Sequence, residues 1–538
     1  MYYNKYVYKK IICATIVILF ICSSSWAVTY YVDATNGNDS NAGTSEATSW
    51  KTIAKVNASR FNPGDQILFK RGEIWREQLI VPSSGNAEKP ITFGAYGSGD
   101  KPIIDAADKV TSWKRVGENV WKSDVINETK QIFFNQTKGA IETSLLGLDT
   151  VKEWFWENRV LYIYSELDPT VVYTNPGIEA SQRDQCVNIN RKNYITLLNL
   201  KVKGANAQWR GNIDDYDASG LSSREGIVIK DCESLYAYNY GIRIDIDNIA
   251  GVLTGVNIYN NVVHHNGTGT NGFGILLQGT SGGSFADIEI HGNNTHGNRE
   301  EGISFSDGTA EIYENYSYGD GLQRSAGIII GPNTSNTKVY KNRVENPVLE
   351  GIWVHGNNDS GLEIYYNLLY GGAAFGIQID QAGAGTKIYN NTIHNMNGGI
   401  AIGITSQSKG ILINNNIIDA LNDGSGNFES HNSSTYTSDY NCWDENKNFY
   451  PENVGKTWTE WKTLGFDQHS LYEDPHFIDP AGYNFALRGN SPCKDAGMNV
   501  GLNEDHIGNS VPMYNMPDMG AYEYKITPPK NLRIILIE

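Results

Sequence analysis

Cysteine is scarce and scattered in this chain of 538 residues. Of its six cysteines, Cys13 and Cys22 lie within the first 27 residues. The others are Cys186, Cys232, Cys442 and Cys493. No CxxC pair occurs among them, which excludes the common zinc-finger and zinc-ribbon patterns. A disulfide is compatible with an exported protein, but the spacing assigns no pairing.

Charged residues are also few, and basic residues are fewer than acidic ones. Charged residues make up only 19% of the chain, and the formal net charge is −17 at pH 7. A protein that binds nucleic acid through the phosphate backbone needs a basic surface, so we expect no nucleic-acid partner.

Long hydrophobic runs are missing except at the N-terminus. Residues 11–22, "IICATIVILFIC", follow three lysines and precede "SSSWA", whose small residues end at Ala27. Twelve apolar residues are short for a membrane span, so we predict a signal peptide at 1–27. An N-terminal anchor is the alternative. We expect a secreted, extracellular or periplasmic protein without membrane attachment after signal removal.

Glycine and asparagine, in contrast, recur in two alternating motifs. The first is Gly-Ile-x-apolar, and it begins at Gly226, Gly241, Gly274, Gly302, Gly327, Gly351, Gly376 and Gly399. The second is apolar-x-x-Asn, and it ends at Asn261, Asn293, Asn315, Asn342, Asn367, Asn391, Asn416 and Asn441. Leu200 and Cys232 hold the same slot in two earlier repeats.

These repeats predict an all-β fold, a right-handed parallel β-helix of about ten or more coils. Each motif is too short for a helix and alternates with period two, and a repeat of 20 to 50 residues is typical of a solenoid. Inward Ile, Val and Leu, such as Ile388, form the core. We predict that each asparagine takes the left-handed bend between strands and stacks in a ladder, rather than binding a ligand.

The remaining segments complete the predicted organisation. Residues 28–109 form the N-terminal cap, with a helix within 49–59, and the first coils. An aromatic-rich β lobe is inserted at 110–185, and the coils of the solenoid occupy 186–442. A C-terminal cap follows at 443–524, and 525–538 is a linker or tail.

Several motifs resemble secreted β-helix proteins of the pectate-lyase-like superfamily. "YYVDATNGNDSNAGTSEATSWKTI", "NPGDQILFKRG" and "PITFGAYGSG" are similar to the lead-in of many carbohydrate-active members, including family-nine pectate lyases. "GNSPCKDAG" and "PDMGAYEY" resemble their closing segment. The resemblance implies this fold and a glycan partner, but it leaves the reaction open because the superfamily holds lyases, hydrolases, epimerases and non-catalytic proteins.

The outward positions of the Gly-Ile strands are expected to line the groove. One predicted column is Val228, Arg243, Leu276, Ser304, Ile329, Trp353, Gln378 and Ala401. The second is Lys230, Asp245, Gln278, Ser306, Gly331, His355, Asp380 and Gly403.

Two clusters in these columns are candidate sites. His355 and Asp380 are expected on adjacent coils, where the carboxylate would orient the imidazole as a general base. Trp353 offers a sugar-stacking face, and we expect Gln378, Gln278 and Ser304 to bind substrate. Arg243 and Asp245 share one strand and form the second catalytic candidate. A solvated ion pair beside a surface aromatic would give the same pattern.

Three acids at strand entries are further catalytic candidates. Glu300 and Glu301 precede Gly302, and Glu350 precedes Gly351 two coils later. Two coils span about 9.6 Å, near the upper separation of the carboxyl groups in inverting glycosidases. Acids that are merely solvated at turns are the alternative.

A family-nine pectate lyase would carry an Asp-Asp-Gly-x-Asp calcium motif and a lysine base on the next coil. The comparable residues here are Glu300, Glu301, Gly302 and Ser304, and Ile329 takes the lysine position. The Asp-Pro-His-Asp motif of alginate epimerases is also missing, since "DPHF" at 474–477 lacks the final Asp.

Three functions therefore remain open for a polysaccharide partner. The favoured one is glycosidic-bond cleavage by acid and base residues. The alternatives are a lyase acting on a uronate-containing glycan by β-elimination, for which Ca²⁺ is a candidate cofactor, and a non-catalytic glycan-binding or adhesion protein. No metal ligand is assigned, and we expect a monomer.

Overall fold

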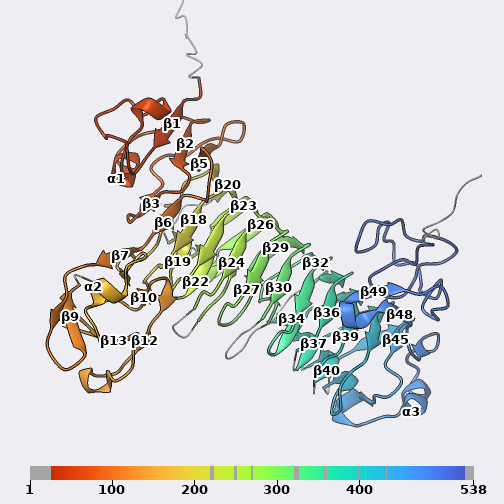
Figure 1. Cartoon of the computed structure of the whole chain (residues 1–538). Coiled ribbons are helices and arrows are strands. Elements are labelled where there is room, and N and C mark those ends of the chain that lie inside the picture. Colours follow the sequence, from red (N-terminus) through yellow and green to blue (C-terminus); the bar gives the residue numbers. More distant parts are fainter. Residues whose placement is uncertain are drawn as a thin grey trace, which may run out of the picture.

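The computed structural model describes residues 26–526 except 126, 219–222, 248–250, 268–270, 320–325, 357–359, 373, 398, 406 and 432. The predicted right-handed parallel β-helix is confirmed: successive coils stack along one axis, with a lobe beside the first coils (Figure 1). Residues 1–25 of the predicted signal peptide and 527–538 of the tail lie outside the described residues.

Each coil contributes one strand to each of three parallel sheets, here named A, B and C. Sheet A consists of β1 (Thr29–Val32), β2 (Gln66–Lys70), β5 (Ile91–Tyr96), β17 (Ile195–Leu198), β20 (Ser223–Lys230), β23 (Val252–Tyr259), β26 (Ser284–His291), β29 (Gly308–Tyr313), β32 (Lys338–Tyr340), β35 (Glu363–Tyr365), β38 (Lys387–Tyr389), β41 (Ile411–Asn414) and β44 (Tyr436–Asp439).

Sheet B follows sheet A in the chain. It consists of β3 (Ile74–Trp75), β6 (Ile103–Asp105), β18 (Lys201–Lys203), β21 (Glu233–Leu235), β24 (Val262–His264), β27 (Asn294–His296), β30 (Tyr316–Tyr318), β33 (Arg343–Glu345), β36 (Leu368–Tyr370), β39 (Thr392–His394), β42 (Ile417–Asp419), β45 (Cys442–Trp443) and β47 (Leu471–Tyr472).

Sheet C completes each coil. It consists of β4 (Leu79–Ile80), β16 (Val187–Asn188), β19 (Gly211–Asp217), β22 (Tyr240–Ile246), β25 (Ile275–Gln278), β28 (Ile303–Phe305), β31 (Ile328–Ile330), β34 (Glu350–His355), β37 (Phe375–Asp380), β40 (Ile400–Ile404), β43 (Gly426–Ser430) and β46 (Phe449–Tyr450).

The core is built from columns of aliphatic side chains in register. In sheet A, Ile229 lies opposite Ile258, which lies opposite Ile290, and Ile388 continues this inward column. All four are fully buried. Burial of one such side chain contributes about 1.5–3 kcal/mol, so the column stabilises each coil through its neighbours.

An asparagine ladder forms the corner between sheets A and B, as predicted. The Nδ2 group of each asparagine from Asn261 to Asn416 donates to Oδ1 of the next ladder asparagine at 2.9–3.0 Å. The predicted left-handed conformation was misplaced by one residue. Positive φ belongs to the residue before each ladder asparagine, such as Tyr366 (φ 53°) or Asn390 (φ 53°). The ladder asparagine itself is buried. Its side chain forms hydrogen bonds with backbone groups that have no strand partner at the bend.

Two strand assignments need correction. The strand with Val228 and Lys230 pairs with Thr196 and Leu198 in sheet A, so neither residue belongs to the groove columns. The sheet C strand at that level is β19, which the Gly-Ile pattern misses because it begins "GNID". At Gly399 the register is shifted by two residues, and Gln378 lies opposite Gly403 rather than Ala401.

The inserted lobe contains two small sheets. One joins β7 (Ala107–Val110), β10 (Ile132–Phe134), β11 (Thr137–Lys138) and β15 (Ile178–Ser181). The other joins β8 (Lys114–Arg115), β9 (Val120–Asp124), β12 (Ala140–Ile141), β13 (Glu153–Glu157) and β14 (Val160–Tyr164), and helix α2 (Pro169–Val172) follows. Trp154 and Phe134 fill the lobe core. Lys203 of sheet B contacts Glu179 of the lobe at 3.0 Å, which ties the lobe to the solenoid.

Caps cover both ends of the solenoid. Helix α1 (Ile53–Asn57) buries Ile53 and Val56 against the first coil, as predicted for a capping helix. At the other end, Trp461 of α3 (Trp458–Thr463) packs on Phe428 and Phe449. The following chain, with β48 (Phe477–Asp479) and β49 (Asn484–Leu487), packs beside sheet B rather than over the end.

An aromatic column runs along the outer face of sheet A. Its members are Tyr259, His291, Tyr313, Tyr340, Tyr365 and Tyr389. Neighbouring rings lie 4.6–5.2 Å apart with interplanar angles of 1–10°. Because each face is covered by the next ring, this column is a structural stack and offers no open face to a sugar.

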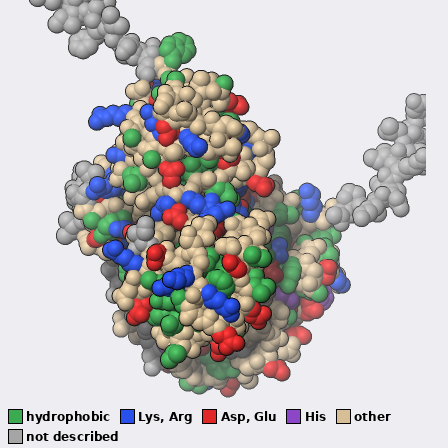
Figure 2. Space-filling model, turned by 60° about the vertical axis from the view of Figure 1, so that its left-hand side comes forward, with side chains coloured by type: hydrophobic (Ala, Val, Ile, Leu, Met, Phe, Trp, Pro, Cys, Tyr) green, Lys and Arg blue, Asp and Glu red, His purple; other side chains and the backbone are tan. Residues whose placement is uncertain are grey.

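The surface mixes charges of both signs. On the face seen in Figure 2, Lys and Arg side chains lie among Asp and Glu side chains, without a field of one sign. Cys186, Cys232, Cys442 and Cys493 are all buried as free thiols. None of the helices in the described part of the chain is long and apolar enough to cross a membrane.

Substitution of a ladder asparagine should destabilise the solenoid strongly. In Asn391→Ala, the buried backbone N–H of Asn367 loses its acceptor, and Asn367 Nδ2, Asn416 Oδ1 and Ile364 O each lose one hydrogen bond. Each buried polar group left unsatisfied costs about 1–3 kcal/mol, so we expect a loss of at least about 2 kcal/mol in urea unfolding followed by circular dichroism. Asn503→Ala, at an exposed position in the cap, is the control. Equal stability of the two variants would contradict the ladder's role.

The C-terminal cap should be sensitive to pH through Glu523. Burial raises the pKa of this carboxyl from 4.5 to about 7, and it raises that of Asp518 to about 6. The folded cap therefore holds protons more tightly than the unfolded chain, and this stabilisation is complete below about pH 4.5 and lost as pH rises through about 7. The stability of Glu523→Gln relative to the wild type should increase as the pH rises from 5 to 8. The relative stability of the exposed control Glu504→Gln should stay the same. Denaturation at pH 5 and at pH 8 measures this stability difference. A difference that does not depend on pH would exclude titration of Glu523 as its cause.

Candidate active-site groove

Two cavities lie along the outer face of sheet C, here called the groove, and a third lies at the corner between sheets C and A at the last coils. The central column of side chains in the groove runs through Asn188, Asp214, Arg243, Leu276, Ser304, Ile329, Trp353, Gln378, Gly403 and Glu429. The lobe pocket, near the first coils, has about 770 Å³. The central pocket has about 640 Å³, and the end pocket at the last coils has about 580 Å³. Strands spaced about 4.8 Å apart make this an extended surface suited to a chain-like ligand.

The central pocket gathers five of the predicted site residues. These are Gln278, Glu301, Ser304, Trp353 and His355. They come from three coils, and the in-register pairing of sheet C brings them to one cavity. Ile329 also lines it, so an aliphatic side chain occupies the place where a family-nine pectate lyase would carry its lysine base.

Trp353 and His355 form an aromatic wall of this pocket. Their ring centroids lie 4.5 Å apart with an interplanar angle of 32°. The buried indole Nε1 of Trp353 finds no acceptor within the described part of the chain. Burial lowers the pKa of His355, while the charge of Asp380 on the next coil opposes that shift. The lowered pKa favours the neutral imidazole, which can both donate to and accept from sugar hydroxyl groups.

Asp380 and Gln378 lie one coil beyond the central pocket. They are opposite His355 and Trp353 in the register of sheet C. Asp380 accepts a hydrogen bond from the Thr405 hydroxyl. Its carboxylate therefore has a partner toward the following coil and a Coulombic influence on His355.

The three predicted strand-entry acids differ in position. Glu301 lines the central pocket and is only 8% exposed. Glu300 and Glu350 are half-buried and are not among the described residues that line that pocket. A second carboxyl group in the pocket belongs to Asp307, which the sequence analysis did not single out.

Asp307 is held firmly at the C-terminal end of β28. Its carboxylate accepts hydrogen bonds from the Gly279 N–H at 3.0 Å, from Asn333 Nδ2 at 2.8 Å and from the Ser306 hydroxyl. Its φ of 64° turns the chain away from the strand. The signal was the "DG" pair directly after the "GISFS" strand, a turn sequence that also places a carboxylate at the groove.

Arg243 and Asp245 form part of a buried network in the groove floor. Arg243 contacts Asp245 and also Asp214, the latter at 3.3 Å. All three are at most 5% exposed. Burial raises the pKa of Asp214, although Arg243 and Arg210 oppose this.

Hydrogen bonds extend this network along the groove in both directions. Gln185 donates to Asp214 at 2.7 Å, next to the lobe pocket. On the other side Gln278 and Thr280 donate to Asp245 at 2.8 and 2.9 Å, next to the central pocket. With its charge already paired, Arg243 is placed to support the groove floor.

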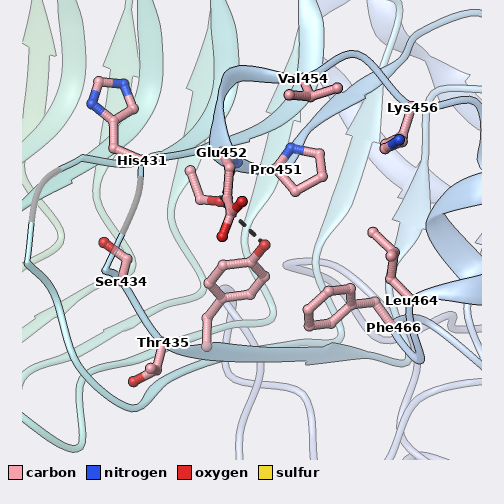
Figure 3. A pocket seen from close by; sticks show the side chains of 11 residues that line it. His431, Ser434, Thr435, Pro451, Glu452, Val454, Lys456, Leu464 and Phe466 are labelled. Atoms are coloured by element: carbon pink, nitrogen blue, oxygen red, sulfur yellow. Dashed lines mark hydrogen bonds between the residues drawn. The ribbon is translucent and has the colours of Figure 1, made fainter.

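The end pocket lies at the last coils, where β43 of sheet C leads into β44 of sheet A. Figure 3 shows His431, Glu452 and Lys456 around it, with Leu464 and Phe466 on the apolar side. His431 Nε2 lies 2.8 Å from Glu429 Oε1, and Ser430 donates to the Tyr436 hydroxyl at 3.2 Å. The Gly-Ile motif does not predict this pocket, because β43 and β46 lack the motif.

Glu300, Glu301 and Ser304 stand at the positions of the calcium motif of family-nine pectate lyases. They are not part of a group of described side chains placed to hold a metal ion. Among the described residues, the one group of three or more His, Cys, Asp or Glu side chains placed to hold a metal ion is His264, His265 and His296. It lies on sheet B, outside the groove.

Arg243 should be a stability residue. Arg243→Ala would leave Asp214 and Asp245 buried without their cationic partner, which costs about 3–5 kcal/mol. Denaturant unfolding measures this against Arg60→Ala, which removes an exposed arginine of the cap. If Arg243→Ala unfolds like the wild type but loses activity, the residue acts directly on substrate and the structural assignment is wrong.

Comparison with known proteins supports the fold. The family "Right handed beta helix region" matches residues 254–418. The structure titled "The complex structure of XylC with xylose" aligns with a TM-score of 0.51 at 14% identity, covering 93% of this chain and 99% of that one. A GH136 lacto-N-biosidase from Eubacterium ramulus gives a TM-score of 0.45 at 15% identity, over 76% of this chain and 67% of that one.

One curated relative is similar in sequence. The lacto-N-biosidase of Bifidobacterium longum subsp. longum is 33% identical over 174 residues, which is 30% of this chain. The match spans about a tenth of that relative's length. The fold expected from the resemblance to pectate-lyase-like proteins is thereby confirmed: this chain is a right-handed parallel β-helix similar to carbohydrate-active proteins.

Proposed function

We propose that this protein is an exported enzyme that binds a glycan chain along the groove of sheet C and hydrolyses one of its glycosidic bonds at the central pocket. The observation that carries the proposal is the lining of that pocket. It combines two carboxyl groups, Glu301 and Asp307, with the aromatic wall of Trp353 and His355. Cleavage of glycosidic bonds typically uses two carboxyl groups beside a sugar site.

Glu301 and Asp307 are alternative catalytic carboxyl groups in this proposal, because six residues of extended chain separate them by about 20 Å at ~3.3 Å per residue. Glu301 is largely withdrawn from water, as suits a general acid. Asp307 is oriented by three hydrogen bonds, as suits a carboxylate that activates water or attacks the anomeric carbon. Trp353 and His355 contact the sugar together, as one wall of the pocket. Gln378 and Asp380 would contact the next sugar along the groove.

Hydrolysis is favoured over elimination by the groove floor. A lyase needs a base beside the proton next to the uronate carboxyl group and a cation that neutralises that carboxyl group. Ile329 takes the place of the lysine base, and Arg243 is engaged with two aspartates. The similarity of part of the chain to a lacto-N-biosidase also supports a hydrolase.

A panel of purified polysaccharides and oligosaccharides tests the reaction class. We expect reducing ends to appear without an absorbance rise near roughly 235 nm, which unsaturated uronates from a base-driven elimination would cause. An absorbance rise would show a lyase instead. Binding without any product would show a glycan-binding protein.

Substitutions in the central pocket test the residue roles on the substrate so identified. Either Glu301→Gln or Asp307→Asn should lower kcat by about 10²–10⁴-fold while leaving the fold intact, and the one that does so identifies the catalytic carboxyl group. His355→Ala should chiefly raise KM. Glu289→Gln, a carboxyl change on sheet A away from the groove, is the matched control. If Glu301→Gln and Asp307→Asn both keep wild-type kcat, the carboxyl assignment is wrong.

A further inference from the structure

Three histidines from two neighbouring coils meet on the outer face of sheet B. His264 ends β24, His265 follows it directly, and His296 lies opposite His264 in the register of β27. Successive residues of a strand normally point to opposite faces. His265 escapes this rule because its φ of 55° ends the strand, and its ring lies 5.0 Å from that of His264.

The ring nitrogens of this histidine cluster converge on a small volume. His264 Nδ1 and His265 Nδ1 are 2.7 Å apart, and one ligand nitrogen from each of the three residues lies within 4.8 Å of the others. Nitrogens around a tetrahedral Zn²⁺ with Zn–N bonds of about 2.0–2.1 Å lie about 3.3 Å apart. Small side-chain rotations are enough to reach that geometry.

The ring orientations differ from those of a simple aromatic stack. On sheet A, neighbouring rings are nearly parallel, within 10°. In the histidine cluster the angles are 45° between His264 and His296, and 84° and 83° for the two pairs with His265. Inclined rings leave their edges, where the nitrogen lone pairs lie, less covered by the neighbouring ring than parallel rings do.

A carboxylate supports the cluster from behind. Glu233 Oε1 lies 3.4 Å from His264 Nε2, the ring nitrogen opposite the one that faces His265. Lys201 donates to the same oxygen at 2.7 Å and fixes it. Histidines that bind metal typically donate their second N–H to a carboxylate of this kind, which sets the ring's tautomer and orientation.

The cluster also lies against the junction with the lobe. Tyr236 packs on His265 at 5.7 Å between centroids, and Phe133 of β10 packs on Tyr236 at 5.5 Å. Gln131 donates to the Tyr236 carbonyl oxygen at 2.9 Å. An ion held here would therefore link two coils and stiffen the platform on which the lobe rests.

The geometry points to a binding site for a divalent transition metal ion of the Zn²⁺ type, held by His264, His265 and His296 beside the lobe. Three imidazole nitrogens suit Zn²⁺, Cu²⁺ or Ni²⁺, whereas Ca²⁺ prefers oxygen ligands. A water molecule would supply the fourth ligand. The role is structural, because the site lies on sheet B and the groove lies on sheet C.

Calorimetric titration with ZnCl₂ tests the site, using the full chain without a polyhistidine tag after chelator treatment. We expect about one equivalent of Zn²⁺ and a higher unfolding temperature with the ion than without it. His264→Ala and His296→Ala should each weaken binding by at least about tenfold. Glu233→Gln should keep the stoichiometry and weaken binding by about 10–100-fold. With Co²⁺ as the probe, visible absorption should report a tetrahedral ion.

His469→Ala is the matched control, since His469 is 62% exposed on another coil. It should bind Zn²⁺ like the wild type. The proposal is overturned if the wild type binds no more Zn²⁺ than the double variant His264→Ala/His296→Ala, or if His469→Ala loses as much affinity as His264→Ala. Equal unfolding temperatures of chelator-treated wild type and variants show that the substitutions act on the metal and not on folding.

Discussion

The in-register stacking of identical corners is the constraint on which the rest of this structure depends. The side chain of each ladder asparagine binds the coils before and after it. Its Nδ2 group donates both to the next asparagine and to a backbone carbonyl of the preceding coil. The amide thereby fixes the height and the rotation of each coil relative to its neighbours. A slip of one residue would turn every inward isoleucine outward, so the corner and the core enforce the same register.

A fixed register on one corner frees the others to vary. The turn between sheets A and B is short and repetitive, whereas the connections around sheet C differ in length from coil to coil. Because the strands of sheet C remain aligned, side chains from distant parts of the sequence line one groove at regular intervals. This explains how His355 lines the same cavity as Glu301 and Asp307, although it comes from a repeat two coils later.

The three outer faces have different physical uses. Sheet A carries a stack of parallel rings that covers its own surface, and sheet C carries the cavities of the groove. Sheet B carries charged and aromatic side chains that hold the lobe near its first coils and the C-terminal cap near its last ones. The histidine cluster lies on the lobe side of sheet B. The groove and its supports are therefore separate surfaces of one scaffold.

The amino-acid sequence by itself determined the solenoid, its direction of stacking and its ladder, because a period of about 25 residues with alternating apolar positions admits few folds. It also identified the strand that holds Trp353 and His355, since the Gly-Ile motif marks sheet C at every repeat except that of Gly226. Only the tertiary structure decided which polar residues are accessible. Arg243 and Asp245 look like exposed candidates in a strand pattern, but the neighbouring coil buries them against Asp214. Asp307, His431 and the histidine cluster depend on turns and on register between coils, which local periodicity does not encode.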